Sequence, residues 1–172
     1  MASEPPTERP CQVTTVDRSR PFPVRYGELA LRLSELGALA IVEALALISA
    51  GAANPKEQNP SLVTHAPKVT RDAAKIDWTQ TAAQVSRVIR AYDPRPAAFT
   101  TANGSEVKLF HPYLADGLSG NAGQVLAAGE ELVVACGEGA VRISEVQPAG
   151  RRRMAASDWT RGRAVAVGDV LG

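Results

Sequence analysis

The dipeptide Asn103-Gly104 stands between two short segments in which apolar and polar residues alternate. Both central residues of a type I′ turn have positive φ angles, and Asn followed by Gly adopts them readily, so the pair predicts a tight β-hairpin. In the flanking segments, 98–101 and 106–113, every second side chain falls on one face, as in a half-buried sheet. We therefore expect an antiparallel hairpin at the start of a β-domain.

Further short apolar segments follow the hairpin at 124–126, 132–136 and 140–146, with glycines between them. Several short strands at such spacing are typical of a small barrel or sandwich. A short helix at 154–160 and a last strand segment at 165–171 would complete it. Before the hairpin, apolar residues recur every three to four positions and predict a helix over 80–91, with Thr79 as its N-cap and Pro94 and Pro96 beyond its end.

The first third of the chain has a different character. Residues 1–25 contain five of the twelve prolines, show no periodicity, and are expected to be a disordered extension. Residues 26–50 carry leucines and alanines at helical spacing, with a possible break at Gly37, and this broad apolar stripe is expected to bury against something. Proline and asparagine punctuate residues 51–75, which we interpret as a linker.

Composition limits the class of protein. Of the 172 residues 45% are hydrophobic, which permits a core, and the formal net charge of +1 excludes a strongly basic nucleic-acid-binding protein on bulk charge alone. Two cysteines, Cys11 and Cys136, are too few for a disulfide framework. We find neither an apolar run of 18 residues nor a signal-peptide pattern, so we expect a cytoplasmic protein without membrane association.

A search for catalytic or metal-binding patterns finds none. His65 lies in the linker and His111 precedes Pro112, and neither has the spacing of a metal site, so we expect a surface or half-buried role for both. Cys136 ends an apolar segment, where a buried inert thiol is expected. No glycine-rich phosphate loop or nucleophile elbow occurs. We therefore expect no catalytic residue, metal or cofactor site in this chain.

Arginine and lysine residues carry the strongest functional signal. Three consecutive arginines follow Pro148-Ala149-Gly150 and are expected on an exposed loop, where their side chains bury little. A second group falls on the predicted helix and hairpin. The two groups are either a solvated surface or a phosphate-binding patch. The candidate residues are Arg87, Arg90, Arg95, Lys108, Arg151, Arg152 and Arg153.

Several segments resemble the methionyl-tRNA formyltransferase family. They are Thr-His-Ala-Pro-Lys at 64–68, Lys-Ile-Asp-Trp at 75–78, Arg-Val-Ile-Arg-Ala-Tyr-Asp-Pro-Arg-Pro at 87–96, Val-Gln-Pro-Ala-Gly-Arg-Arg-Arg-Met at 146–154 and Gly-Asp-Val-Leu-Gly at 168–172. The second and third are shared with related folate-dependent formyltransferases and formyl hydrolases, whereas the fourth points more narrowly to the tRNA enzyme.

The resemblance implies a function. In this family a Rossmann-like domain binds 10-formyltetrahydrofolate and formylates methionyl initiator tRNA, and a C-terminal domain resembling an OB-fold barrel helps to hold the tRNA. Residues 26–50 would then be a helical remnant of the catalytic domain, 51–75 the linker and 76–172 the OB-like domain. The expected fold is mainly β with flanking helices. Initiator tRNA would be the partner, together with the missing catalytic domain, and Lys68 joins the seven candidates above as a tRNA-binding residue.

The chain also departs from the family. The catalytic Asn, His and Asp and the Ser-Leu-Leu-Pro loop are missing, and residues 1–25 match nothing in the pattern, as a truncated or frame-shifted gene product would produce. We therefore expect tRNA binding without formyl transfer and no cofactor bound by this chain. Three alternatives stay open: a natural stand-alone module, the C-terminal domain of another formyltransferase or formyl hydrolase, and a basic interaction domain without a nucleic-acid partner.

Overall fold

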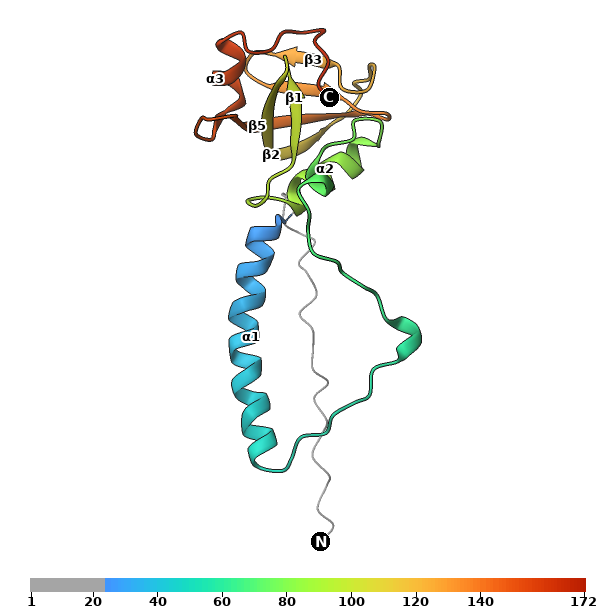
Figure 1. The fold of residues 1–172 in the computed structure, drawn as a ribbon, viewed down its shortest axis with the longest axis vertical. Helices are drawn as coiled ribbons and strands as arrows, with labels where there is room; N and C mark the ends of the chain where they lie inside the picture. Colours follow the sequence, from blue (N-terminus) through green and yellow to red (C-terminus); the bar gives the residue numbers. More distant parts are fainter. Residues whose placement is uncertain (1–23) are drawn as a thin grey trace.

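A computed structural model describes residues 24–172. Figure 1 shows a small curled sheet with short helices beside it, from which one long helix projects. We call residues 72–172 the β-domain. The disorder expected for the N-terminal extension falls mainly on residues 1–23, which lie outside the described part of the chain. The elements in order are α1 (Tyr26–Ser49), η1 (Pro60–Leu62), η2 (Asp72–Ala74), α2 (Ala82–Ala91), β1 (Phe99–Ala102), β2 (Ser105–Ala115), β3 (Val125–Ala128), β4 (Leu132–Ala135), β5 (Ala140–Pro148), β6 (Met154–Ala155) and α3 (Ala156–Arg161).

The sheet is antiparallel, with strand order β1-β2-β5-β4-β3 and with β6 paired to β5. Its longest pairing joins β2 to β5, from Val107 opposite Pro148 to Ala115 opposite Ala140. The predicted hairpin is confirmed: Asn103 and Gly104 have φ angles of 48° and 74° between the two strands β1 and β2. A curled antiparallel sheet with a few flanking helices also confirms the expected fold class, mainly β and OB-like.

Helix α2 covers the inner face of this sheet. Val85 and Ile89 on the helix and Leu109 and Ile143 on the strands are all almost fully buried in one apolar cluster. The indole N–H of Trp78 donates a 3.0 Å hydrogen bond to Thr100, so the polar end of this buried ring has a partner. The hydrophobic effect on this cluster holds helix and sheet together.

The predicted N-cap of α2 is wrong by two residues. Thr81 caps the helix: its hydroxyl accepts from the Gln84 amide at 3.3 Å, and the Gln84 side chain accepts from the Thr81 amide at 3.0 Å. Thr79 instead donates from its amide and hydroxyl to Asp77, at 3.0 and 2.7 Å, in a turn before the helix. Thr79 and Thr81 are both suitable cap residues, but the Thr79 side chain is already hydrogen-bonded to Asp77, so Thr81 caps the helix.

The strand expected at 165–171 is also wrong. Val165 and Leu171 are buried as anchors, but the backbone between them turns and forms a single bridge, Gln124 with Val170. The reason is local: the Asp169 carboxylate accepts from the Ala166 amide at 2.8 Å, and Gly168 has a φ of 95°. An aspartate that binds the backbone nearby stabilises a turn over an extended segment.

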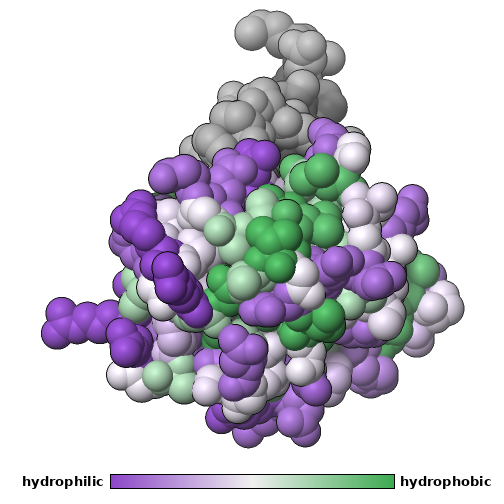
Figure 2. All heavy atoms as spheres, turned by 90° about the horizontal axis from the view of Figure 1, so that it is seen from above, coloured by the Kyte–Doolittle hydropathy of each residue, from purple (hydrophilic) through white to green (hydrophobic). Residues whose placement is uncertain are grey.

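Helix α1 runs unbroken through Gly37, so the expected break is absent. One glycine destabilises a helix by about 1 kcal/mol, which the surrounding leucines and alanines offset. Within residues 24–172 no side chain of α1 is buried; Leu39 is 73% exposed and Leu33 58%. The apolar stripe is therefore bare, whereas the end of the β-domain far from α1 mixes hydrophilic side chains with several separate apolar areas, the widest near its centre (Figure 2). None of the described helices is long and apolar enough to span a membrane.

Candidate functional site

Three cations gather around an aromatic ring on the outer face of β1 and β2. A groove there is lined by Arg71, Arg95, Phe99, Glu106 and Lys108, together with the backbone near them. Phe99 and Lys108 are register partners on neighbouring strands. The Arg71 guanidinium lies 5.4 Å from the Phe99 ring centroid and pairs with Glu106. We call this the basic groove.

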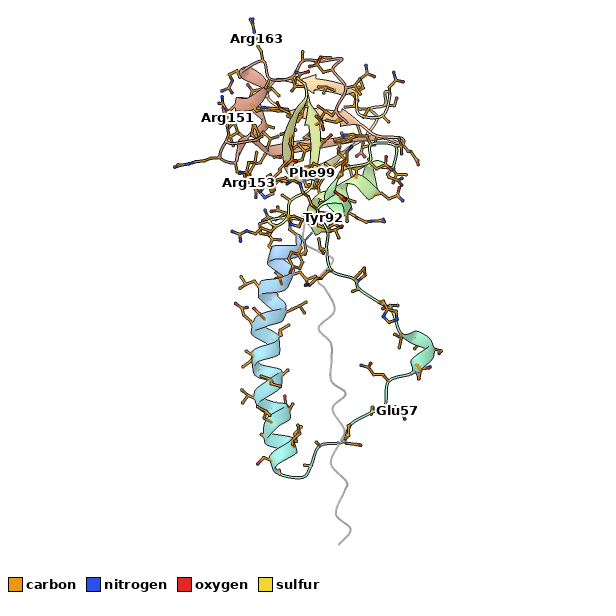
Figure 3. The ribbon with its side chains drawn as sticks, in the orientation of Figure 1. Glu57, Tyr92, Phe99, Arg151, Arg153 and Arg163 are labelled. Atoms are coloured by element: carbon orange, nitrogen blue, oxygen red, sulfur yellow. The ribbon has the colours of Figure 1, made fainter. Side chains whose placement is uncertain are left out.

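The loop at 149–152 begins beside the basic groove. Its Ala149 amide donates to the Glu106 carbonyl on β2 at 3.0 Å. The Arg151 carbonyl accepts from the side chain of Gln147, which is the register partner of Lys108, at 3.0 Å. Arg151 and Arg152 are exposed, and Figure 3 shows Arg151 projecting from the β-domain. We call this the arginine loop; with the groove it forms one basic surface over β1, β2 and β5.

Arg153 behaves differently from its two neighbours. Its guanidinium pairs with Glu145 and with Asp93 at 3.3 Å, and it lies 3.8 Å from the ring centroid of Phe110. Its side chain is 31% exposed. The expectation that all three consecutive arginines bury little is therefore wrong for Arg153, because residues far away in sequence supply its partners.

Asp93 is the centre of a cluster of five charged or polar residues at the base of α1. Its carboxylate, 5% exposed, also accepts from Arg25 Nη1 at 3.5 Å. Arg25 Nη1 contacts His111 Nε2, and His111 Nδ1 lies 3.5 Å from Glu145. We call Arg25, Asp93, His111, Glu145 and Arg153 the Asp93 cluster.

Burial, together with the neighbouring guanidiniums of Arg25 and Arg153, favours the neutral form of the His111 ring and so lowers its pKa. The charges of Glu145 and Asp93 act in the opposite direction. A neutral imidazole can accept at Nε2 from Arg25 while donating from Nδ1 to Glu145. His111 is half-buried, as expected, but it belongs to a network that its spacing in the sequence did not reveal.

Arg90 is held by the start of the chain that the structure describes. Its Nη1 donates to the Val24 carbonyl at 3.1 Å, and its buried Nε has no hydrogen-bond partner among residues 24–172. Burial lowers the pKa of Arg90, and the charge of Arg87 lowers it further. Arg87, three residues earlier, is exposed. Although both lie on α2, only Arg87 is open to a ligand.

The eight candidate residues thus fall into separate groups. Arg95 and Lys108 line the basic groove, Arg151 and Arg152 form the arginine loop, and Arg153 belongs to the Asp93 cluster with Arg90 beside it. Arg87 lies on the outer side of α2 and Lys68 in the exposed segment before η2. Sequence reasoning missed Arg71, Phe99 and Arg25. Lys68, Arg71 and Lys75 follow one another at intervals of three and four residues, and this basic repeat is the sequence signal that could have indicated Arg71.

The buried thiol of Cys136 gives a pH-dependent prediction. The residue is 2% exposed, and burial raises the pKa of its thiol from 9.0 to about 11, as an inert structural cysteine requires. The folded state then holds its proton more tightly than the unfolded state, so the stability from this thiol is complete below pH 9 and is lost as the pH rises toward 11. We expect the free energy of unfolding in urea to fall by about 1.4 kcal/mol more between pH 8 and pH 10 than in Cys136→Ala. If the free energy of unfolding changes by the same amount between pH 8 and pH 10 in both proteins, this prediction is wrong.

Comparison with known proteins identifies the family. Residues 68–164 match the family described as "Formyl transferase, C-terminal domain". A methionyl-tRNA formyltransferase of Magnetococcus marinus is 36% identical over 173 residues, covering 100% of this chain and 55% of the relative. That alignment includes the first 25 residues, so the expectation that they match nothing in the family is contradicted. A methionyl-tRNA formyltransferase of Jannaschia sp. is 44% identical over 145 residues, covering 84% of this chain and 46% of the relative.

Solved structures of HypX from Aquifex aeolicus share the fold. One variant aligns with a TM-score of 0.58 and 26% identity over 75% of this chain and 23% of HypX. Another, in complex with tetrahydrofolic acid, aligns with a TM-score of 0.54 and 27% identity over 69% of this chain and 21% of HypX. The chain spans about half the length of the curated relatives that it matches. The match to more than half of its residues shows that the chain belongs to the formyl transferase family, whose C-terminal domain it contains, and the relatives confirm its resemblance to the methionyl-tRNA formyltransferases.

Proposed function

We propose that this chain binds tRNA through the basic groove and the arginine loop, as the tRNA-holding part of a methionyl-tRNA formyltransferase. The observation that carries the proposal is that Arg71, Arg95 and Lys108 line one groove together with Phe99. Arg151 and Arg152 lie nearby in the connection between β5 and β6. Three cations in one groove, with two more on the adjoining loop, suit the closely spaced phosphates of a nucleic-acid backbone. Arg71 is partly neutralised by Glu106, so a phosphate would have to displace that carboxylate.

Such a surface recognises the shape of RNA more than its sequence. The major groove of an A-form helix is too narrow for side chains to read, and exposed arginines engage phosphates in pairs of hydrogen bonds. Phe99 adds an aromatic face on which an unpaired base can stack if Arg71 moves aside. We therefore propose that this chain contributes affinity for tRNA, and that the choice of the initiator is made elsewhere in the enzyme.

Binding of tRNA predicts a defined salt dependence. In filter-binding titrations with initiator tRNA, log K against log salt should be linear, with a slope of about 0.7–0.9 per neutralised phosphate. The double variant Arg151→Ala/Arg152→Ala should reduce the magnitude of that slope by the amount that corresponds to up to two phosphate contacts. Its melting temperature should be unchanged because both side chains are exposed. Arg142→Gln is the matched control: Arg142 is an exposed arginine near the other end of β5, paired with Glu131 at 2.9 Å. If the double variant binds as the parent does, the arginine loop is a solvated surface.

We propose further that the chain does not transfer a formyl group by itself. The reaction needs a base for the attacking amine and donors for a tetrahedral oxyanion beside the folate. Among residues 24–172 the His111 ring is engaged with Arg25 and Glu145, and the Cys136 thiol is buried. Charged initiator tRNA with 10-formyltetrahydrofolate should show no product above background. Turnover approaching that of a full-length enzyme would refute this.

A second candidate function is favoured by the structural comparison. HypX shares the fold, and one of its structures holds tetrahydrofolic acid. On that basis the chain would be the C-terminal domain of a folate-dependent formyltransferase whose substrate is not a tRNA. The same titration separates the two candidates, because absence of tRNA affinity at low salt would favour the second.

A further inference from the structure

Helix α1 is joined to the β-domain at its first turn. The Gly27 amide donates to the Asp93 carbonyl at 3.0 Å, and the Val24 carbonyl accepts from Arg90 at 3.1 Å. A Cβ on Gly27 would lie 2.8 Å from Pro94 Cδ, so only glycine lets the two backbones approach this closely. From there α1 points away from the β-domain, as Figure 1 shows, and its side chains are not buried.

The carboxylate of Asp93 joins the helix to the sheet. It accepts from Arg25 on the helix side at 3.5 Å and from Arg153 on the sheet side at 3.3 Å, and it is 5% exposed. Arg153 is in turn held by Glu145 and by the face of Phe110. A nearly buried carboxylate between two guanidiniums has few alternative arrangements, because any movement of one partner leaves a buried charge unpaired.

His111 completes the helix side of this arrangement. Its backbone has a φ of 50°, a left-handed conformation that residues other than glycine rarely adopt. There its ring contacts Arg25 Nη1 from one side and faces Glu145 from the other. Strained backbone conformations persist where surrounding contacts fix them, and here those contacts belong to the Asp93 cluster.

We propose that Asp93 is a positioning residue: its carboxylate, clamped between Arg25 and Arg153, fixes the direction in which α1 leaves the β-domain. The clamp also ties Arg153, and with it the end of the arginine loop, to the base of the helix. It does not depend on tRNA binding, because all its partners lie within the chain. Loss of the Asp93 charge should leave the β-domain folded and free α1 to swing.

The test is a distance measurement between nitroxide labels in the full chain. The labels are attached at two exposed positions, Glu43→Cys on α1 and Glu130→Cys in the turn between β3 and β4. Of the two natural cysteines, Cys11 is replaced by serine, and Cys136 is buried and is not labelled. The labels are placed in chains that also carry Leu33→Gln, Leu36→Gln and Leu39→Gln, which weaken association through α1, and dilution with unlabelled chain removes distances between molecules. Double electron–electron resonance should give one narrow distance in the parent, and Asp93→Asn and Arg25→Gln should each lose it in favour of a broad distribution.

Two controls keep the result interpretable. Arg151→Gln removes an equal charge from the neighbouring loop and should retain the narrow distance. Circular dichroism and the fluorescence of Trp78 and Trp159 report whether the β-domain of each variant is folded. If Asp93→Asn is not folded, Arg25→Gln alone decides, since Asp93 then keeps Arg153 as a partner. A broad distribution in the parent, or the parental distance in a folded Arg25→Gln chain, would overturn the proposal.

Discussion

Removal of residues 1–67 is expected to abolish self-association of this chain and to leave the β-domain folded. Helix α1 exposes apolar side chains on all sides, among them Leu39 at 73% and Val42 at 67%. Burying one such side chain is worth about 1.5–3 kcal/mol, so several together strongly favour association. Sedimentation velocity over a range of concentrations should show oligomers for the full chain and a monomer for the chain that begins at Lys68.

A second variant separates the effect of the helix surface from that of its length. Leu33→Gln, Leu36→Gln and Leu39→Gln together keep good helix formers in place and should weaken self-association of the full chain, although Val42 and other exposed apolar side chains of α1 remain. The truncated chain also loses Arg25, so we expect its unfolding to stay cooperative with a lower midpoint, since Asp93 retains only Arg153. Loss of cooperative unfolding in the truncated chain would show that α1 is part of the folding core.

Gly137→Ala is expected to be one of the most destabilising single substitutions in this protein. Gly137 lies in the connection between β4 and β5 and donates its amide to the carbonyls of Trp78 and Gln80, at 2.8 and 2.9 Å. A Cβ there would overlap the backbone carbonyl of Thr79, which cannot move aside as a flexible side chain could. Overpacking and the loss of these hydrogen bonds together should lower the free energy of unfolding by about 3 kcal/mol or more.

Gly129→Ala is the matched control for this prediction. It lies in the connection between β3 and β4, and a Cβ there meets nothing within 4 Å. Urea unfolding followed by the fluorescence of Trp78 and Trp159 should give a parental midpoint for Gly129→Ala and a much lower one for Gly137→Ala. Equal midpoints would mean that the segment before α2 does not pack against this turn in solution.

The sequence determines those features of the protein that depend on neighbours in the chain. The positive φ angles at Asn103 and Gly104 are a local preference, and the hairpin forms where they predict it. The alternating segments become β1 and β2, the short apolar segments at 132–136 and 140–146 become β4 and β5, and the helical repeat before them becomes α2. Local signals also place Cys136 in the core and Arg151 and Arg152 on the surface. The same order of short motifs was enough to indicate the family.

Contacts between distant residues decided the rest. Arg153 is chemically identical to Arg151, yet Asp93, Phe110 and Glu145 hold it in place, and they are 60, 43 and 8 residues away. Arg71 lies in the basic groove because its guanidinium pairs with Glu106 on β2 and lies over the ring of Phe99 on β1. A charged side chain takes whichever partner the fold brings within reach, and its own sequence neighbourhood does not contain that information.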